Sequence, residues 1–238
     1  MNKLLQRYLY FMLGVVIISF GSVFITKSAL GTSQISSIPY VSSLFFEHIS
    51  FGMATFIFNM IFIVLQLAIL RKNFPPVQCF QVLVNIIFSM CIDFSMSMLQ
   101  WLQPEHMIAR IACLLIGCVI LGVGISIEVA PGVLVIPAEG IVRVIAEVVK
   151  QEFGKVKVYF DICLIIIAVL LSFVFFQSLR GVGVGTIISS FMVGKIVSLV
   201  NIHVPFIKKI KALEMEEKKF HYQTGNNKTD QGVKAVKF

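Results

Sequence analysis

The sequence has little charge and few residues that could carry catalysis. Of its 238 residues only 13% are charged, and there are four histidines and five cysteines. The cysteines lack paired or metal-type spacing, no His-Glu metal pattern occurs, and no nucleophile is paired with a base. The glycine-rich stretch "GVGVGT" (181–186) lacks the preceding strand, the glycine spacing and the Lys-Ser/Thr of a phosphate-binding loop. These absences argue against an enzyme, no cofactor or metal is expected, and primary pumping would require another chain.

What the sequence does contain is apolar surface. Hydrophobic residues make up 58% of the chain, including 22 phenylalanines, and the mean hydropathy is +0.92. A core of this size could not hide so much apolar surface from water. Apolar runs of about 20 residues, enough to cross roughly 30 Å of hydrocarbon, occur at 8–26, 51–70, 77–99, 111–129, 156–176 and 182–204. We therefore predict an all-α integral membrane protein with six transmembrane helices and the lipid bilayer as its partner.

The positive charges follow the predicted spans. In a soluble protein a formal net charge of +8 would indicate a nucleic-acid-binding surface. Here the lysines and arginines cluster between the spans, so they report the orientation of the protein in the membrane. No nucleic-acid partner is expected. With the amino end in the cytoplasm, the outside segments hold only Lys27, Arg110 and Arg180. The inside segments then hold Lys3, Arg7, Arg71, Lys72, Arg143, Lys150, Lys155, Lys157, Lys208, Lys209 and Lys211. This asymmetry predicts a multi-pass protein of the cell membrane with both termini cytoplasmic.

Two pairs of glycines mark close helix packing. Gly14 and Gly21 lie seven residues apart in the first span, and Gly117 and Gly124 lie seven apart in the fourth. Small residues two turns apart share one helix face and allow another helix to approach closely. The second pair follows the first by about one hundred residues.

A longer similarity has the same offset. "FGMATFIFN" (51–59) aligns with "FGKVKVYFD" (153–161), so that Asn59 and Asp161 occupy equivalent positions. We interpret this as an internal duplication, with a first repeat at 1–104 and a second at 105–206. Each repeat has three spans, so the second must enter the membrane from the opposite side. Inverted repeats of this kind are typical of secondary transporters, whose sites lie between the halves.

Each predicted repeat also contains a break followed by a short helix. The short segments are 31–47 and 136–150, and each begins beside glycine or proline. They are too short to span the bilayer, and they fit either re-entrant or interfacial half-helices. Non-helical backbone at membrane depth is tolerated only where protein or a water-filled cavity satisfies its polar groups. Each break is therefore a candidate lining of a cavity.

The first break offers hydroxyl and amide groups at a helix start, where free N–H groups suit an anionic or carbonyl-bearing ligand. The alternative is ordinary capping of a short helix. We treat these residues as candidates for binding a small polar or anionic solute: Thr32, Ser33, Gln34 and Ser36.

Four charged residues near or within spans are further candidates. Glu139 follows Pro137 in the second break and could bind a cation or relay a proton, or it could cap a helix at the interface. Lys195 lies near the middle of the last span and needs a partner, either in a structural ion pair or at a substrate site. Asp93, Asp161 and Glu139 are the carboxylates available to it, and all three are candidates for an ion or proton relay. Asn59 and Asp161 could form paired gates or paired packing hydrogen bonds.

Several blocks resemble a known group of proteins. "ALGTSQISSIPYV", "FGMATFIFN", "IPAEGIVRVIAE", "FGKVKVYFDI" and "GVGVGTIISSFMVGK" resemble the YczE/YitT-like bacterial membrane proteins, particularly the YczE branch. The similarity extends from about residue 7 to 204. Members often have Ser-Pro where this chain has Ser33-Gln34, and Gly where it has Ala138. The resemblance implies a bacterial inner-membrane location and no established substrate or catalytic residues.

Two functions fit these observations. The first is a secondary transporter or facilitator of a small polar solute, with a site between the inverted repeats. The second is an accessory or regulatory membrane protein that binds a partner through its spans or its tail and transports nothing. The charged segment 207–238 has little apolar content and is predicted to be a disordered cytoplasmic tail. The oligomeric state is left open, including a homo-oligomer.

Overall fold

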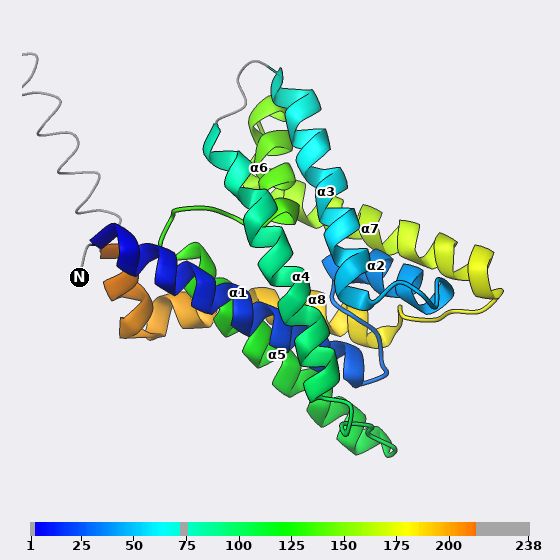
Figure 1. Ribbon diagram of the computed structural model, residues 1–238. Coiled ribbons are helices and arrows are strands. Elements are labelled where there is room, and N and C mark those ends of the chain that lie inside the picture. Colours follow the sequence, from blue (N-terminus) through cyan, green and yellow to red (C-terminus); the bar gives the residue numbers. More distant parts are fainter. Residues whose placement is uncertain (1–2, 72–75, 213–238) are drawn as a thin grey trace, which may run out of the picture.

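The protein is built from helices, with no strand in the described residues (Figure 1). The structure, a computed structural model, describes residues 3–71 and 76–212. Six helices are long and apolar enough to cross a membrane, which agrees with the number of spans predicted. They are α1 (Lys3–Lys27), α3 (Phe51–Leu70), α4 (Phe80–Met98), α5 (Met107–Val129), α7 (Phe153–Phe176) and α8 (Val184–His203).

The remaining helical elements are short and lie where the sequence breaks. α2 (Gln34–Phe45) and α6 (Pro137–Val149) occupy the two short segments predicted, and a 3-10 turn, η2 (Pro76–Cys79), precedes α4. Pro137 lies in the first turn of α6, where a proline costs no helical hydrogen bond. At 12 and 13 residues, α2 and α6 are too short to cross about 30 Å of hydrocarbon.

The centre of the fold is an antiparallel pair, α1 and α5. A Cβ atom added at Gly14 would lie 2.5 Å from the backbone nitrogen of Glu128, and one at Gly21 would lie 2.5 Å from that of Leu121. The glycines of α5 face α1 in the same way. Added Cβ atoms there would lie 2.7 Å from the nitrogen of Ile25 for Gly117, and 2.8 Å from that of Ile18 for Gly124. The glycine pattern thus correctly predicted close helix contact, and the structure identifies the two helices.

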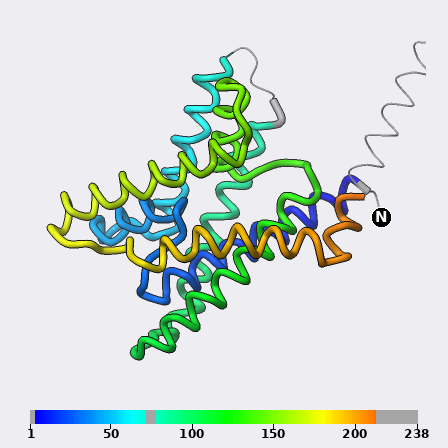
Figure 2. The backbone as a smooth tube through the Cα atoms, turned by 180° about the vertical axis from the view of Figure 1, so that it is seen from behind, coloured from blue at the N-terminus to red at the C-terminus, as the bar shows by residue number. Residues whose placement is uncertain are grey.

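The other helices pack around this pair. α4 packs on α1 and α3, whereas α8 packs on α5, and Figure 2 shows α8 running beside α5. The short helices cross between the halves of the chain. α2 packs on α3 and α7, and α6 packs on α3 and α7 as well, as seen where α6 lies beside α3 and α2 beside α7 in Figure 1.

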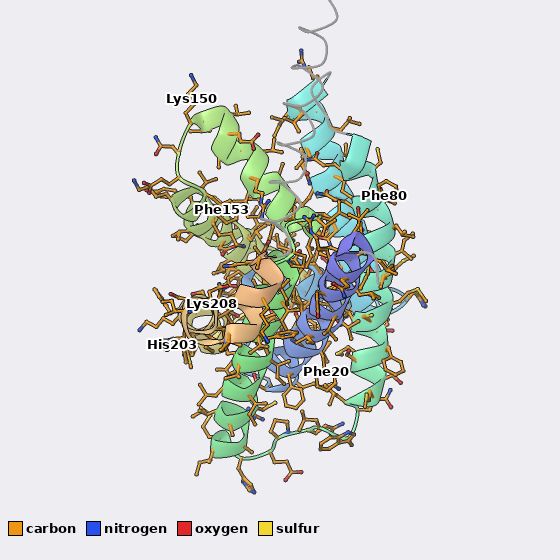
Figure 3. All side chains as sticks on the ribbon, turned by 90° about the vertical axis from the view of Figure 1, so that its left-hand side faces the viewer. Phe20, Phe80, Lys150, Phe153, His203 and Lys208 are labelled. Carbon is orange, nitrogen blue, oxygen red and sulfur yellow. The ribbon has the colours of Figure 1, made fainter. Side chains whose placement is uncertain are left out.

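The outer faces of the long helices carry apolar side chains. Phe94 on α4 and Phe191 on α8 are each 70% exposed, and Figure 3 shows side chains such as Phe80 and Phe153 projecting from the helices. In water such a surface would be unfavourable, but in a bilayer it faces lipid tails. The buried core lies mainly between α1, α4 and α5, with Phe11, Ile92 and Leu114 at its centre.

The predicted tail begins later than residue 207. Residues 205–212 are helical, and Ile207 and Ile210 are each 1% exposed because they pack against Ile127 and Ala130 of the α5 end. In the sequence, the surrounding lysines obscure this apolar pair. Lys72 of the orientation argument and residues 213–238 lie outside the described residues.

Candidate functional site

The break between α5 and α6 is the most unusual part of the interior. Pro131 and Pro137 bracket residues 131–137, and Gly132 has a φ of 59°, which lies in the left-handed region that glycine favours. Three of the six non-helical residues 131–136 are buried. A buried non-helical segment leaves backbone N–H and C=O groups that need partners.

Side chains from three helices supply those partners. Arg7 of α1 donates from Nε to the carbonyl of Pro131 at 2.9 Å, and its Nη2 lies 3.4 Å from the carbonyl of Gly132. Gln66 of α3 donates from Nε2 to the carbonyl of Pro137 at 3.1 Å. The backbone N–H of Ile136 donates to Oε1 of Glu128 on α5 at 3.2 Å. The break is therefore held by long polar side chains that reach it from α1, α3 and α5.

Glu128 is the key acidic group of this site. Its side chain is 0% exposed, and its backbone packs on Gly14 of α1, where any larger residue would collide with it. Oε1 accepts the Ile136 N–H, but Oε2 has no hydrogen-bond partner among the described residues. Burying an unpaired carboxylate oxygen is costly, and Oε2 can instead hold a proton.

Further charged groups surround Glu128. Glu139 of α6 lies close enough for an electrostatic interaction with Glu128. Glu139 itself interacts with Lys157, Arg143 and Asp161, and burial raises its pKa while the two cations lower it. Lys157 donates to Asp161 at 2.7 Å within α7. Glu128 thus has Glu139 and Arg143 as charged neighbours, and Glu139 in turn interacts with Lys157 and Asp161 of α7.

A cavity of about 310 Å³ opens beside the break. Residues 132–135 of the break form one wall, and α6 forms another through Gly140, Arg143 and Glu147. Gln81 of α4 and Gln78 of η2 complete a polar lining. A Cβ atom at Gly140 would lie 2.8 Å from Oε1 of Gln66 and from Nε2 of Gln81, so a larger residue there would displace these amides. This cavity offers an arginine, a carboxyl group and two amides to a solute.

The first break lies elsewhere and is closed by α8. The N–H of Thr32 donates to Oγ1 of Thr186 at 3.1 Å, and the Thr32 hydroxyl donates to the carbonyl of Gly181 at 3.2 Å. The N–H of Gly185 donates to the carbonyl of Leu30 at 2.8 Å. The glycines of "GVGVGT" therefore allow close approach of two backbones, since a Cβ atom at Gly183 would lie 2.5 Å from the Leu30 oxygen.

The serines of the first break bond to one another. Ser33 donates to Ser36 at 2.8 Å, and Ser36 is also 2.8 Å from Ser22 of α1. Ser33 occupies the N-cap position of α2 but makes no side-chain capping bond. Gln34 is half-buried. These hydroxyls join α1 to α2, which is a packing role.

The structure thus divides the predicted binding residues between two places. Thr32 and Ser33 lie at the first break, beside a separate cavity of about 580 Å³ that Gly31 and Gly183 help to line. Glu139 lies at the second break. The two cavities share no lining residue, so each break borders a cavity of its own.

Two other candidates also lie away from the second break. Asp93 accepts from the Ser50 hydroxyl at 2.6 Å and from the Gly52 N–H at 2.7 Å, so it holds the start of α3 to α4. Lys195 is exposed on α8 and has no partner within residues 3–71 and 76–212. The expectation that Lys195 meets a carboxylate partner is wrong within the described residues, because its side chain lies on the outer surface.

The two equivalent repeat positions, Asn59 and Asp161, do not pair with each other. Asn59 bonds to Asn85 of α4 at 2.9 Å, whereas Asp161 pairs with Lys157 within α7.

Sequence reasoning missed Glu128 and Gln66 as residues that bond to the break. Both lie inside runs that were identified as spans, so their polarity was hidden by their apolar neighbours. A carboxyl group inside a predicted span is itself a signal of function. Glu128 is the only acidic residue of α5 and directly precedes the break.

Comparisons with known proteins place the chain in one family. A family model described as a family of unknown function, DUF6198, matches residues 5–202. No curated protein and no solved structure matches the chain. The match shows membership of this family of unknown function and does not name the YczE/YitT-like group.

Proposed function

We propose that this chain, which belongs to the DUF6198 family, is a multi-pass membrane carrier that moves a small polar solute in exchange with protons. The observation that carries this proposal is the environment of Glu128. Its carboxyl group is fully buried, one of its oxygens is unpaired among the described residues, and it holds the broken backbone beside a polar cavity. Ionisable residues inside a membrane typically mark solute pathways and proton relays.

The geometry connects protonation to the shape of the break. An ionised Glu128 accepts the Ile136 N–H more strongly than a neutral one, because a hydrogen bond to a charged acceptor is roughly twice as strong. Loss of the charge would therefore loosen the turn into α6. Since α6 carries Gly140 and Arg143 into the cavity wall, a change at Glu128 would reach the bound solute. Glu139 and Arg143 interact electrostatically with Glu128, so gain or loss of its proton would also act on these two groups.

We also propose that the two halves are inverted repeats. In support, the glycine contacts between α1 and α5 are reciprocal. Gly14 meets Glu128 near one end of the pair, and Gly117 meets Ile25 near the other. The exchange of short helices is reciprocal too, since α2 packs on α7 and α6 packs on α3. A two-fold axis in the membrane plane would produce both patterns.

The orientation and location of the carrier follow from the charge pattern. We infer that both termini face the cytoplasm, because the segments on that side hold most of the lysines and arginines. The resemblance to the YczE branch supports a bacterial inner membrane. The role is that of a carrier and not of an enzyme.

Proton movement in vesicles tests this function even though the solute is unidentified. Purified protein is reconstituted with a pH indicator inside, and small polar solutes are added outside one at a time. We expect an effective solute to change the internal pH with wild-type protein, and Glu128→Gln to abolish the change while the protein stays folded. Glu47→Gln is the control, because Glu47 is exposed and lies outside the site. A Glu128→Gln protein that behaves as wild type, or a wild type that responds to no solute, would contradict the proposal.

A further inference from the structure

A line of polar side chains runs along one face of α4. Gln81, Asn85, Ser89 and Asp93 follow one another at intervals of four residues, which places them on the same side of a helix. From Gln81 to Asp93 the line extends about 18 Å at the helical rise per residue. The first three are buried and Asp93 is half-buried, so the line faces the interior and not lipid.

Polar groups of α3 meet this line at three levels. Gln66 donates to Gln81 at 3.3 Å at one end, and Ser50 and the Gly52 N–H donate to Asp93 at the other. Between them Asn59 donates to Asn85 at 2.9 Å, and Asn85 donates to the carbonyl of Phe56 at 3.0 Å. The exposed fractions of Asn59 and Asn85 are 2% and 0%. We call this contact between α3 and α4 the polar seam.

The polar seam contains two unpaired groups, one on each side of the asparagine pair. Oε1 of Gln66 and Oγ of Ser89 are buried without a hydrogen-bond partner in the part of the chain that the structure describes. Helix packing alone does not account for them, because packing hydrogen bonds stabilise helices only when both groups are paired. Unpaired buried oxygens of this kind are positions where a passing solute could donate a hydrogen bond.

A cavity lies at each end of the polar seam. Gln81 lines the cavity of about 310 Å³ beside the second break. Ser89 and Asp93 line a different cavity, of about 470 Å³. Its other lining residues are His48, Ser50 and the apolar Met53, Phe56, Ile86 and Met90. Gln81 and Ser89 are separated by about 12 Å along α4. The asparagine pair lies on α3 and α4 between the levels of these two cavities.

We propose that the polar seam is the passage for the solute, that the Asn59–Asn85 pair is its closed constriction, and that the solutes are small, uncharged molecules with hydroxyl or amide groups. This inference rests on the proposed carrier function and names its solute class. Amides both donate and accept, so they can exchange their mutual bond for bonds to such a molecule. An ion would lose its hydration at a constriction without a free charge, which is unfavourable. Asp93 does not supply that charge at the constriction, because it lies eight residues, about 12 Å, along α4 from Asn85.

Labelling of single cysteines tests whether water enters the polar seam from both ends. The native residues Cys79, Cys91, Cys113, Cys118 and Cys163 are first replaced by alanine. Gln81→Cys and Ser89→Cys are then exposed to a charged thiol reagent on either side of sealed vesicles. We expect Gln81→Cys to react from one side only and Ser89→Cys from the opposite side only. Leu83→Cys is the control, because Leu83 lies on α4 but 54% of it is exposed on the outer surface, and it should react from neither side.

Two labelling outcomes would overturn the passage. One is that neither Gln81→Cys nor Ser89→Cys reacts. The other is that both react from the same side, because the asparagine pair would then not separate two cavities.

Downhill flux of urea and glycerol tests the constriction and the solute class. The double variant Asn59→Leu with Asn85→Leu replaces both partners by apolar groups of similar size, which preserves packing at little cost. We expect its flux to fall roughly 5- to 150-fold, because the solute loses about 1–3 kcal/mol of hydrogen bonding at the constriction. Asn85→Ala widens the constriction, so its flux should equal or exceed that of wild type.

The outcomes separate this inference from the carrier proposal. If the folded Asn59→Leu, Asn85→Leu variant passes urea and glycerol as fast as wild type, the polar seam is not the passage. The carrier proposal would still stand in that case, provided that Glu128→Gln abolishes proton movement. Absence of urea and glycerol flux with wild-type protein would overturn the solute class. Loss of flux in the double variant together with the expected labelling would support both passage and class.

Discussion

The packing of α1 on α5 gives a prediction that can be worked out from distances. Gly14→Ala places a Cβ atom 2.5 Å from the backbone nitrogen of Glu128 and 2.6 Å from its Cα. Non-bonded heavy atoms pack best at roughly 3.5–4.0 Å, so the two backbones must separate by about 1 Å. Inserting one methyl group into a tight interior typically costs about 1–3 kcal/mol. The backbone of Glu128 cannot swing aside as a long side chain could.

A matched variant removes the effect of helix propensity. Gly194 lies within α8, and a Cβ atom there would meet nothing within 4 Å in the described part of the chain. Both Gly14→Ala and Gly194→Ala gain up to about 1 kcal/mol of helix propensity. The difference between them therefore isolates the contact with α5. At about 2–4 °C per kcal/mol, Gly14→Ala should melt roughly 2–12 °C below Gly194→Ala.

Thermal unfolding in detergent can be followed with a thiol-reactive dye. Cys113 and Cys118 of α5 are buried and become accessible when α5 separates from its neighbours. Cys79 and Cys163 are exposed and are replaced by alanine in every variant. Equal melting temperatures for Gly14→Ala and Gly194→Ala would refute the close antiparallel contact of α1 with α5.

The remaining predictions concern single contacts. The pKa of Glu139 is raised by burial, so the folded protein keeps a proton that the unfolded chain has lost. The protonated Glu139 therefore stabilises the fold at low pH, and this stabilisation is lost as the pH rises through the pKa of Glu139 in the folded protein. Over that pH range the melting temperature of wild type should fall, and it should fall less in Glu139→Gln. An equally steep fall would show that other groups cause it. Asp93→Ala removes the acceptor of the Ser50 and Gly52 bonds and should cost about 1–3 kcal/mol, measured as a lower melting temperature. Asp93→Asn should lose less, and an unchanged melting temperature for Asp93→Ala would contradict its role at the start of α3.

The spans and the short helices could be predicted because they depend on properties that lie along the chain. Length and apolarity decide whether a helix crosses a bilayer, and the six runs found by that criterion agree with the six long helices. The breaks were equally visible, because proline and glycine interrupt helices wherever they are placed. The glycine spacing indicated a tight helix contact.

The partners in space could not be predicted from the same sequence. The glycines show that α1 has a close neighbour, but nothing in their spacing selects α5. Lys195 was expected to meet a carboxylate because it lies mid-span, yet the outcome depends on which face of α8 is turned outward. Thr32 was expected to face a solute, but it is bonded to Thr186 and Gly181 from the far end of the chain.

Two features of the site were present in the sequence but were obscured by their surroundings. Glu128 is the one carboxyl group among the 23 residues of α5, which apart from Arg110 are otherwise apolar or small, and its position just before the break was the signal. The polar seam was readable as a four-residue period from Gln81 to Asp93. Average hydropathy over a span conceals such a line, because the flanking residues on the lipid face are strongly apolar.

The central claim is that Glu128 holds and releases a proton at the break between α5 and α6. Infrared difference spectroscopy of the reconstituted protein measures this directly, through the C=O stretching band of a protonated carboxyl group as pH is changed or an effective solute is added. We predict a band change in wild type and in Glu47→Gln that is missing from Glu128→Gln. Identical difference spectra for wild type and Glu128→Gln would contradict the claim.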